Sequence, residues 1–293
     1  MKDDTSTPTA GLDELVQLVR AGKKYEAISE ALIRSVGRRE LAARRNLKEA
    51  VKATRNKLHQ VAGAYLDARP PYEAWLELLA EAATPDDRGP TIDDEHGVNP
   101  KLKTQNSKLA AVCRELMRHH ASTRERLAIL GSFYATTLAS IQPVRSVLDV
   151  ACGLNPLAIP WMPLAAGATY HACDLYADMA DFLNRFLRLA GVQGGAQVCD
   201  LLSGPPRETV DLALVLKALP PLDQLEKNAG RDLLRALDAR HMLVSFPARS
   251  LGGRSKGMVV YYEERFRALA DAEGWAIERF EFPTELAFLV RRA

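Results

Sequence analysis

Three aspartates in the second half of the sequence follow apolar, strand-like runs and could bind one ligand together. Asp149, Asp174 and Asp200 lie at or near the ends of three successive runs of this kind. Parallel strands present their carboxyl ends at one edge of a sheet, and ligands bind at that edge. The three carboxylates are therefore expected to meet at a single site, although an aspartate after a strand is also a common turn residue.

The turn after the first of these runs limits the kind of ligand. It reads DVACGLNP (149–156) and contains one glycine, Gly153, which permits a tight turn and a close approach of the backbone to a ligand. The G-x-G-x-x-G pattern of dinucleotide binding is absent, so a nucleoside without phosphates is expected. Asp174 follows at about 20 residues, the spacing at which a carboxylate meets ribose hydroxyls. Asp200 would then accept the adenine amino group, and Leu201 would supply a backbone amide.

The elements that must hold these residues alternate between strand and helix from Arg145 onward. Five apolar β-type runs are separated by helical patterns, which is typical of a parallel sheet covered on both faces. These runs cover 146–152, 168–175, 196–202, 210–216 and 241–246, and helices are predicted at 178–190, 222–239 and 261–274. Two further runs, 275–282 and 286–292, are separated only by a Pro-Thr-Glu turn, which permits only an antiparallel pair.

A parallel sheet that ends in an antiparallel hairpin resembles the class I fold of S-adenosylmethionine-dependent methyltransferases. This fold is α/β and Rossmann-like, with a mostly parallel seven-stranded sheet. Residues 11–105 instead show helical periodicity, including a long amphipathic run from Arg38 to Ala68 and a helix over Tyr72–Ala83. A length of 293 residues favours two domains. We predict a helical N-terminal domain over 1–105 and a methyltransferase domain over 106–293.

The net charge of +2 seems unfavourable to a nucleic-acid partner, but the charges are segregated along the chain. Between Arg34 and Lys57, nine basic residues stand against two acidic ones, and between Asp67 and Glu95 the numbers are reversed. The two stretches are either solvated helix faces that attract each other or, for the first, a surface that binds phosphate. The candidate RNA-binding residues in it are Arg38, Arg39, Arg44, Arg45, Lys48 and Lys52.

The cysteines and the N-terminus indicate where the protein works. Four cysteines occur without CxxC pairs or Cys/His zinc spacing, so we expect a reducing, cytoplasmic setting and no metal. No apolar run has the length of a membrane span, and the sequence begins without the pattern of a signal peptide.

Several strings resemble one family, the aminoglycoside-resistance methyltransferases that modify guanine N7 in the decoding A site of 16S ribosomal RNA. The strings are LHQVAGAYL (58–66), HASTRERL (120–127), LDVACGLNPLA (148–158), CDLYADM (173–179), LVLKALPPLDQLE (214–226) and VSFPARSLGGRSKGM (244–258). The resemblance covers most of the chain, from about Arg34 onward. It implies S-adenosyl-L-methionine as the cofactor and the small (30S) ribosomal subunit as the substrate.

The resemblance also assigns residues to the cofactor. Arg126 would pair with the carboxylate of the methionine moiety, because a guanidinium binds a carboxylate through two hydrogen bonds. Leu216 and Lys217 would lie next to the transferred methyl group. The other implied cofactor residues are Tyr65, His120, Ala121, Ser122, Ala151, Gly153, Asp174, Asp200, Leu201 and Gln224. Family members often carry two glutamines where this chain has Gln224-Leu225.

The expected reaction needs no general base, since guanine N7 carries a free lone pair and loses no proton. Catalysis would come from positioning the base in line with the sulfur–methyl bond. The glycine-rich loop with Arg249, Arg254 and Lys256 is interpreted as a loop that binds RNA phosphates or, alternatively, as a mobile surface loop.

Three other functions stay open from the residues alone. They are methylation of a small molecule, RNA binding without catalysis, and methylation of an adenine in the same A site. We expect a monomer that acts without a membrane or a metal.

Overall fold

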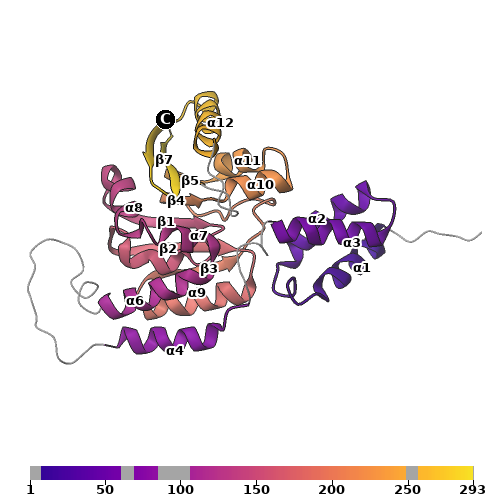
Figure 1. Ribbon diagram of the computed structural model, residues 1–293, viewed down its shortest axis with the longest axis horizontal. Coiled ribbons are helices and arrows are strands. Elements are labelled where there is room, and N and C mark those ends of the chain that lie inside the picture. Colours follow the sequence, from indigo (N-terminus) through magenta and orange to yellow (C-terminus); the bar gives the residue numbers. More distant parts are fainter. Residues whose placement is uncertain (1–7, 61–68, 85–105, 249–256, 293) are drawn as a thin grey trace, which may run out of the picture.

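A seven-stranded sheet forms the centre of the computed structural model, which describes residues 8–60, 69–84, 106–248 and 257–292 (Figure 1). The strand order is β3-β2-β1-β4-β5-β7-β6. β1 to β5 pair in parallel, and β7 pairs antiparallel with both β5 and β6. The class I methyltransferase fold predicted from the sequence is confirmed. The strands are β1 (Val144–Val150), β2 (Leu164–Asp174), β3 (Gln193–Val198), β4 (Val210–Leu216), β5 (Ala239–Pro247), β6 (Ala276–Glu281) and β7 (Glu285–Arg291).

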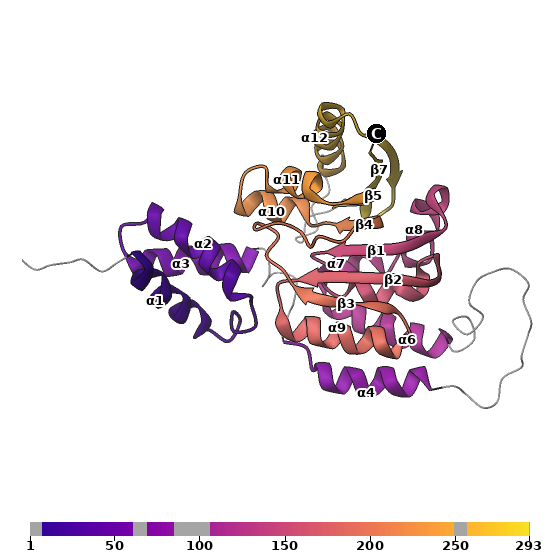
Figure 2. The same ribbon diagram turned by 180° about the vertical axis from the view of Figure 1, so that it is seen from behind.

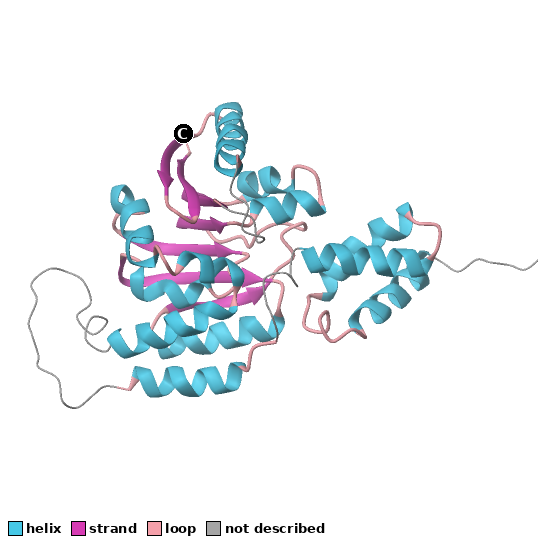
Figure 3. Ribbon diagram, viewed as in Figure 1, coloured by secondary structure: helices cyan, strands magenta, loops and turns pink. Residues whose placement is uncertain are grey.

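Helices cover both faces of the sheet because the buried strands are apolar on both sides. Leu212 and Leu214 of β4 belong to one buried cluster, whereas Ala213 and Val215 belong to a second one. α6 (Asn106–Leu116), α8 (Leu130–Thr137) and α9 (Ala177–Leu189) contribute to the first cluster. α10 (Leu219–Leu225), α11 (Ala229–Ala236) and α12 (Met258–Glu273) contribute to the second (Figure 3). The short elements are α7 (Ala121–Arg126) and the 3₁₀ helices Met117–His119, Ala139–Ile141 and Asn155–Trp161.

Three helices at the N-terminus form a separate unit: α1 (Pro8–Arg20), α2 (Glu30–Ala43) and α3 (Leu47–Leu58). The prediction of one continuous helix from Arg38 is wrong, because the helix is interrupted between α2 and α3. Arg44 has an extended backbone there, and the Asn46 side chain accepts a hydrogen bond from the Glu49 amide at 2.9 Å. This N-cap begins a new helix. The predicted end of the run lies outside the described residues.

The helix predicted over 222–239 is also divided. α10 ends at Leu225, Asn228 has a left-handed backbone with φ of 69°, and α11 begins at Ala229. A non-glycine residue with positive φ interrupts a right-handed helix. Ala239 already belongs to β5.

α4 (Tyr72–Ala83) packs against the sheet domain and not against α1–α3 (Figure 1). The rings of Tyr72 and Phe182 of α9 stack at 4.8 Å, and Trp75 meets the same phenyl ring at 5.8 Å. The predicted domain boundary at residue 105 lies outside the described residues.

The unit of α1–α3 is attached beyond the carboxyl ends of the parallel strands (Figure 2). Ser29 donates its backbone amide to the Leu175 carbonyl at 2.9 Å, and Ala177 donates to the Ala27 carbonyl at 3.3 Å. An ion pair between Arg39 of α2 and Glu226 adds a second attachment. A mainly basic segment is thereby held next to the edge where ligands bind. None of the helices in the described ranges is long and apolar enough to cross a membrane.

Candidate functional site

A cavity at the carboxyl ends of β1, β2 and β4 brings together residues from distant parts of the chain. Six of its lining residues were predicted from the sequence: His120, Ser122, Ala151, Asp174, Leu216 and Lys217. The other four lining residues, which were not predicted, are Leu175, Tyr176, Ala218 and Pro221. The carboxyl ends of three neighbouring strands, β2, β1 and β4, therefore meet at this edge, as the switch-point rule requires.

Asp174 organises the backbone at this edge. One carboxylate oxygen accepts the Gly153 amide at 2.8 Å, and the other accepts the Leu175 amide at 2.7 Å. Burial raises the pKa of Asp174, while hydrogen bonds from backbone amides act in the opposite direction. The carboxylate links the glycine turn after β1 to the end of β2, and it is one of the cavity-lining groups.

Backbone strain marks the same cavity. Ala151 and Lys217 have positive φ angles of 50° and 60°, although neither is glycine. Such conformations cost free energy and persist where the surrounding structure imposes them, most often at functional sites. In this cavity they follow β1 and β4, so the strain lies where the strands end and the site begins.

Position 153 requires glycine for two reasons, its backbone conformation and the neighbouring His120 ring. Its φ is +50°, and an added Cβ would lie 2.6 Å from the His120 imidazole. Burial lowers the pKa of His120 to about 3, so this ring is neutral at pH 7. The neutral imidazole packs over the glycine turn and occupies the space a side chain would need.

We expect Gly153→Ala to weaken binding of S-adenosylmethionine by about tenfold or more, because overpacking and a strained φ displace the turn. Isothermal titration calorimetry measures the dissociation constant directly. The matched control is Gly131→Ala, where no atom lies within 4 Å of the added Cβ. Equal affinity in the two variants would contradict the assigned role of the turn.

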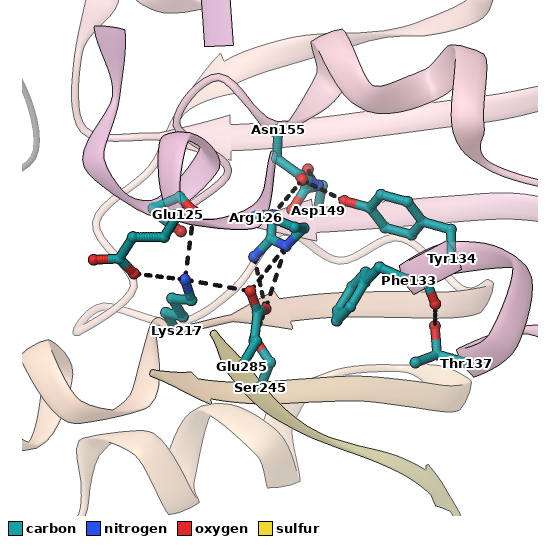
Figure 4. A network of polar contacts seen from close by, with 11 residues as sticks. Glu125, Arg126, Phe133, Tyr134, Thr137, Asp149, Asn155, Lys217, Ser245 and Glu285 are labelled. Carbon is teal, nitrogen blue, oxygen red and sulfur yellow. Dashed lines mark hydrogen bonds and ion pairs between the residues drawn. The ribbon is translucent and has the colours of Figure 1, made fainter. Parts of the chain in front are cut away.

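A buried network of charges connects this edge with β7 (Figure 4). The Arg126 guanidinium is fully buried and donates to the Glu285 carboxylate, with a shortest distance of 2.8 Å. Its remaining nitrogen, Nη1, donates to the Asn155 amide oxygen at 2.8 Å. The Ser245 hydroxyl donates to Glu285 at 2.6 Å. Arg126 is absent from the cavity lining, so its contact with a cofactor carboxylate stays a prediction.

Lys217 joins the same network from the end of β4 (Figure 4). Its ammonium lies 2.7 Å from Glu125 and 3.2 Å from Glu285. Burial raises the pKa of Glu285, but Arg126 and Lys217 outweigh this effect and lower it below the ordinary value. Two carboxylates therefore neutralise the cation that lines the cavity.

Asp149 joins the network through Asn155 (Figure 4). It accepts hydrogen bonds from the Asn155 amide at 2.9 Å and the Tyr170 hydroxyl at 2.6 Å. Burial raises its pKa to about 6 in spite of these donors. The Tyr134 hydroxyl completes the network by donating to the Asn155 oxygen. Asp149 is absent from the cavity lining, so its contacts serve the network beneath the site.

Several other predicted residues lie away from the cavity lining. The Asp200 carboxylate accepts the Leu202 amide at 3.0 Å and the Ser203 hydroxyl at 3.2 Å, which is the geometry of a turn. Leu201 and Ala121 are buried. Gln224 lines a different cavity, described below. Their contacts with a cofactor stay predictions. Tyr65, Arg249, Arg254 and Lys256 lie outside the described residues.

Most of the predicted basic residues are exposed at the end of α2 and the beginning of α3. Lys48 and Lys52 lie four residues apart on α3, which places them on one helix face. Arg39 is the exception, since it is half-buried and paired with Glu226. The exposed members are Arg38, Arg44, Arg45, Lys48 and Lys52.

The missed residues differ in the signal they carried. Leu175 and Tyr176 directly follow Asp174, and Ala218 directly follows Lys217, so neighbouring positions could have been included. Glu285 carried no local signal, because it reads as part of the turn between two strands. Among the residues that the structure describes, no group of three or more His, Cys, Asp and Glu side chains could hold a metal ion.

Several known proteins resemble this chain over nearly its whole length. The chain is 39% identical to a 16S rRNA (guanine(1405)-N(7))-methyltransferase of Frankia casuarinae, over 96% of this chain and 94% of that protein. It is 34% identical to one of the same name from Micromonospora echinospora, over 98% and 99% of the two chains. The crystal structure of the 16S rRNA methyltransferase RmtF with S-adenosyl-L-homocysteine matches with a TM-score of 0.76 and 29% identity, over 100% of both chains.

The 16S rRNA methylase RmtB is also similar, with a TM-score of 0.73 and 28% identity over 96% of this chain and 98% of that one. A family model described as ribosomal RNA methyltransferase (FmrO) matches residues 21–289. These matches confirm the resemblance seen in the sequence strings. The chain belongs to the ribosomal RNA methyltransferase (FmrO) family.

Proposed function

We propose that this chain transfers a methyl group from S-adenosyl-L-methionine to N7 of a guanine in the decoding A site of 16S rRNA, and so confers aminoglycoside resistance. The observation that carries the proposal is the similarity to 16S rRNA (guanine(1405)-N(7))-methyltransferases over nearly the whole chain. The position of the cavity at the strand ends supports it, because class I folds bind their nucleoside there.

The residues at the strand ends fit this cofactor. The cavity offers a carboxylate at the end of β2, and the Gly153 turn leaves no room for a Cβ. Asp174 would hold the ribose hydroxyls, and Ala151 and Leu216 would pack against the nucleoside. The bound cofactor supplies an electrophilic methyl group on a positively charged sulfur.

The chain's own contribution is to bind, orient and exclude water. Guanine N7 attacks with its lone pair, so no side chain has to remove a proton. Alignment of the two reactants alone can lower the barrier by several kcal/mol. Lys217 would lie at the methyl-proximal end, and Glu125 and Glu285 neutralise its charge. This neutralisation favours the positive charge that N7 methylation places on the base.

The helical unit would bind the ribosomal RNA. The exposed cations of α2 and α3 are held beside the cavity by the contacts of Ser29 and Ala177. Phosphate contacts position a protein on RNA without reading its sequence. The substrate would then be the assembled 30S subunit, whose folded surface a rigid helical unit can recognise, and the enzyme would act as a monomer.

The test compares 30S subunits with naked 16S rRNA as substrates for labelled cofactor. Treatment with borohydride and aniline cleaves RNA at 7-methylguanosine. We expect label in 30S subunits and one cleavage in the A site. Label without cleavage would favour methylation of an adenine, and label only in small molecules would favour methylation of a small molecule. Absence of any label would overturn the enzyme assignment.

A further inference from the structure

A second cavity, of about 380 Å³, has no part in the function proposed above. It lies on the other side of α10, between α10, α11 and α12. Its floor is apolar and includes Leu219, Phe246 and Phe266. The volume is within the range of small-molecule sites in proteins.

Aromatic rings lead from the solvent into this cavity. Tyr261 is 50% exposed, and its ring meets Tyr262 edge-on at 5.4 Å. Tyr262 in turn stacks on Phe246 of β5 at 4.9 Å. The Arg265 guanidinium lies 5.4 Å from the centre of the Tyr261 ring and donates to its hydroxyl at 2.5 Å. The outer ring is thus fixed by a cation and by packing, and a flat ligand could stack on it.

The rim adds hydrogen-bonding groups of both kinds. Asp223 and Gln224 of α10 line one side, and Asn228 and Arg231 line another. Carboxylate and amide oxygens accept hydrogen bonds, whereas amide and guanidinium nitrogens donate them. A nucleobase needs this combination, since it is read by stacking and by the donors and acceptors on its edges. The Asp223 carboxylate already accepts the Gly230 amide at 3.0 Å and Arg231 pairs with Asp232 at 3.2 Å, so these two groups would offer a ligand their remaining acceptor and donor positions.

α10 separates this second cavity from the cavity at the carboxyl ends of β1, β2 and β4, which is called the cofactor cavity because it would hold S-adenosylmethionine. Ala218 and Pro221 line the cofactor side, whereas Leu219 and Pro220 line the second cavity. The two cavities therefore share one helical turn that begins directly after Lys217. An RNA strand that delivers a base to the cofactor cavity would place its neighbouring nucleotide in the second cavity, on the other side of this turn.

We propose that the second cavity binds an unpaired nucleotide of the substrate RNA near the methylated guanine. This inference rests on the proposed function, because it names a further subsite for the same substrate. Tyr261 provides the stacking face, Arg265 and Arg231 provide charge for a phosphate, and Asp223 and Gln224 face the base edge.

The experiment measures binding of 30S subunits by filter retention and their methylation under initial-rate conditions. We expect Tyr261→Ala and Arg265→Gln each to weaken binding and to raise KM for 30S subunits by about tenfold, the effect of one lost base stack. Tyr261→Phe keeps the stacking face and should retain most of the binding. Arg267→Gln is the matched control, since Arg267 is exposed on the same helix and pairs with Glu263 outside the cavity.

Affinity for S-adenosylmethionine should stay unchanged in all four variants, because none of these residues lines the cofactor cavity. Ultraviolet cross-linking of the parent enzyme to 30S subunits should join Tyr261 to rRNA. Parental binding and methylation in both Tyr261→Ala and Arg265→Gln would overturn the subsite while the proposed function stands. A cross-link from Tyr261 to a ribosomal protein would also overturn it. If the parent enzyme neither binds nor methylates 30S subunits, the proposed function itself fails, and the subsite fails with it.

Discussion

Asp174→Ala is expected to abolish measurable binding of S-adenosylmethionine, with a loss of at least about 100-fold. Charge-assisted hydrogen bonds contribute roughly 1.5–3 kcal/mol each, and 1.4 kcal/mol corresponds to a factor of ten. The variant would lose two such bonds to ribose hydroxyls. It would also free the Gly153 and Leu175 amides, which the carboxylate holds at 2.8 and 2.7 Å.

Titration calorimetry of the parent and the variant provides the measurement. Asp174→Asn keeps the size of the side chain but only one acceptor oxygen, so an intermediate loss is expected. Asp178→Ala is the matched control, because Asp178 pairs with Arg69 at 2.9 Å and is absent from the cavity lining. If Asp174→Ala bound the cofactor as tightly as Asp178→Ala, the assignment of the ribose site would be wrong.

Charge reversal on the helical unit of α1–α3 should affect binding of RNA and leave binding of the cofactor unchanged. Lys48→Glu together with Lys52→Glu is expected to spare cofactor affinity and to weaken binding of 30S subunits strongly at low salt, because phosphate contacts dominate that affinity. The same filter-retention assay, repeated at increasing salt, measures it. An equal loss of cofactor affinity and of 30S binding would contradict the proposal that α1–α3 bind RNA while the sheet domain binds the cofactor.

Glu285→Ala should cause the largest loss of stability, roughly 3–5 kcal/mol, because it leaves Arg126 charged and unpaired in the interior. Glu285 accepts from Arg126 and Ser245 and also contacts Lys217 at 3.2 Å, and its side chain is fully buried. A domain has only a few times this free energy of unfolding in total. Denaturant unfolding of the parent and the variant is the measurement.

Two further variants test whether the buried ion pair is the cause of this loss of stability. Glu278→Ala removes an exposed carboxylate from β6, 3.8 Å from Arg291, and should cost less than about 1 kcal/mol. Combining Arg126→Met with Glu285→Gln removes both charges and should recover part of the lost stability. A double variant less stable than Glu285→Ala would count against the ion pair as the cause.

The pH dependence of stability follows from the same pair. The pKa of Glu285 in the folded chain is below its ordinary value of 4.5, so its contribution is complete above that pH and is lost on acidification. Asp149 has the opposite sign, since its raised pKa makes the folded chain less stable as pH increases from 3.8 to about 6. The parent should therefore lose more stability below pH 4.5 than Glu285→Gln does.

Several of the residues that were correctly predicted to line the cavity have positions that depend on local pattern, whereas His120 and Ser122 were predicted only through the family resemblance. Asp174 and Leu216 end apolar strands, and Ala151 follows another, so the strand periodicity and the parallel order bring them to one edge. Asp200 has the same local pattern, yet its carboxylate serves its own turn. Whether a strand-end aspartate faces a ligand or its own backbone depends on loop conformation, which periodicity does not describe.

The sequence by itself determined the class I fold, the basic helical segment, the sheet edge at which the cavity lies and the family. Tertiary structure alone decided that Arg126 pairs with Glu285, 159 residues away, because β7 lies between β5 and β6 and carries Glu285 beneath α7. It also decided that Gln224 faces the second cavity, because α10 ends at Leu225 and presents opposite sides to two cavities. Strand order and the faces of a helix that line a cavity arise from packing across the whole chain, so neither could be obtained from neighbouring residues.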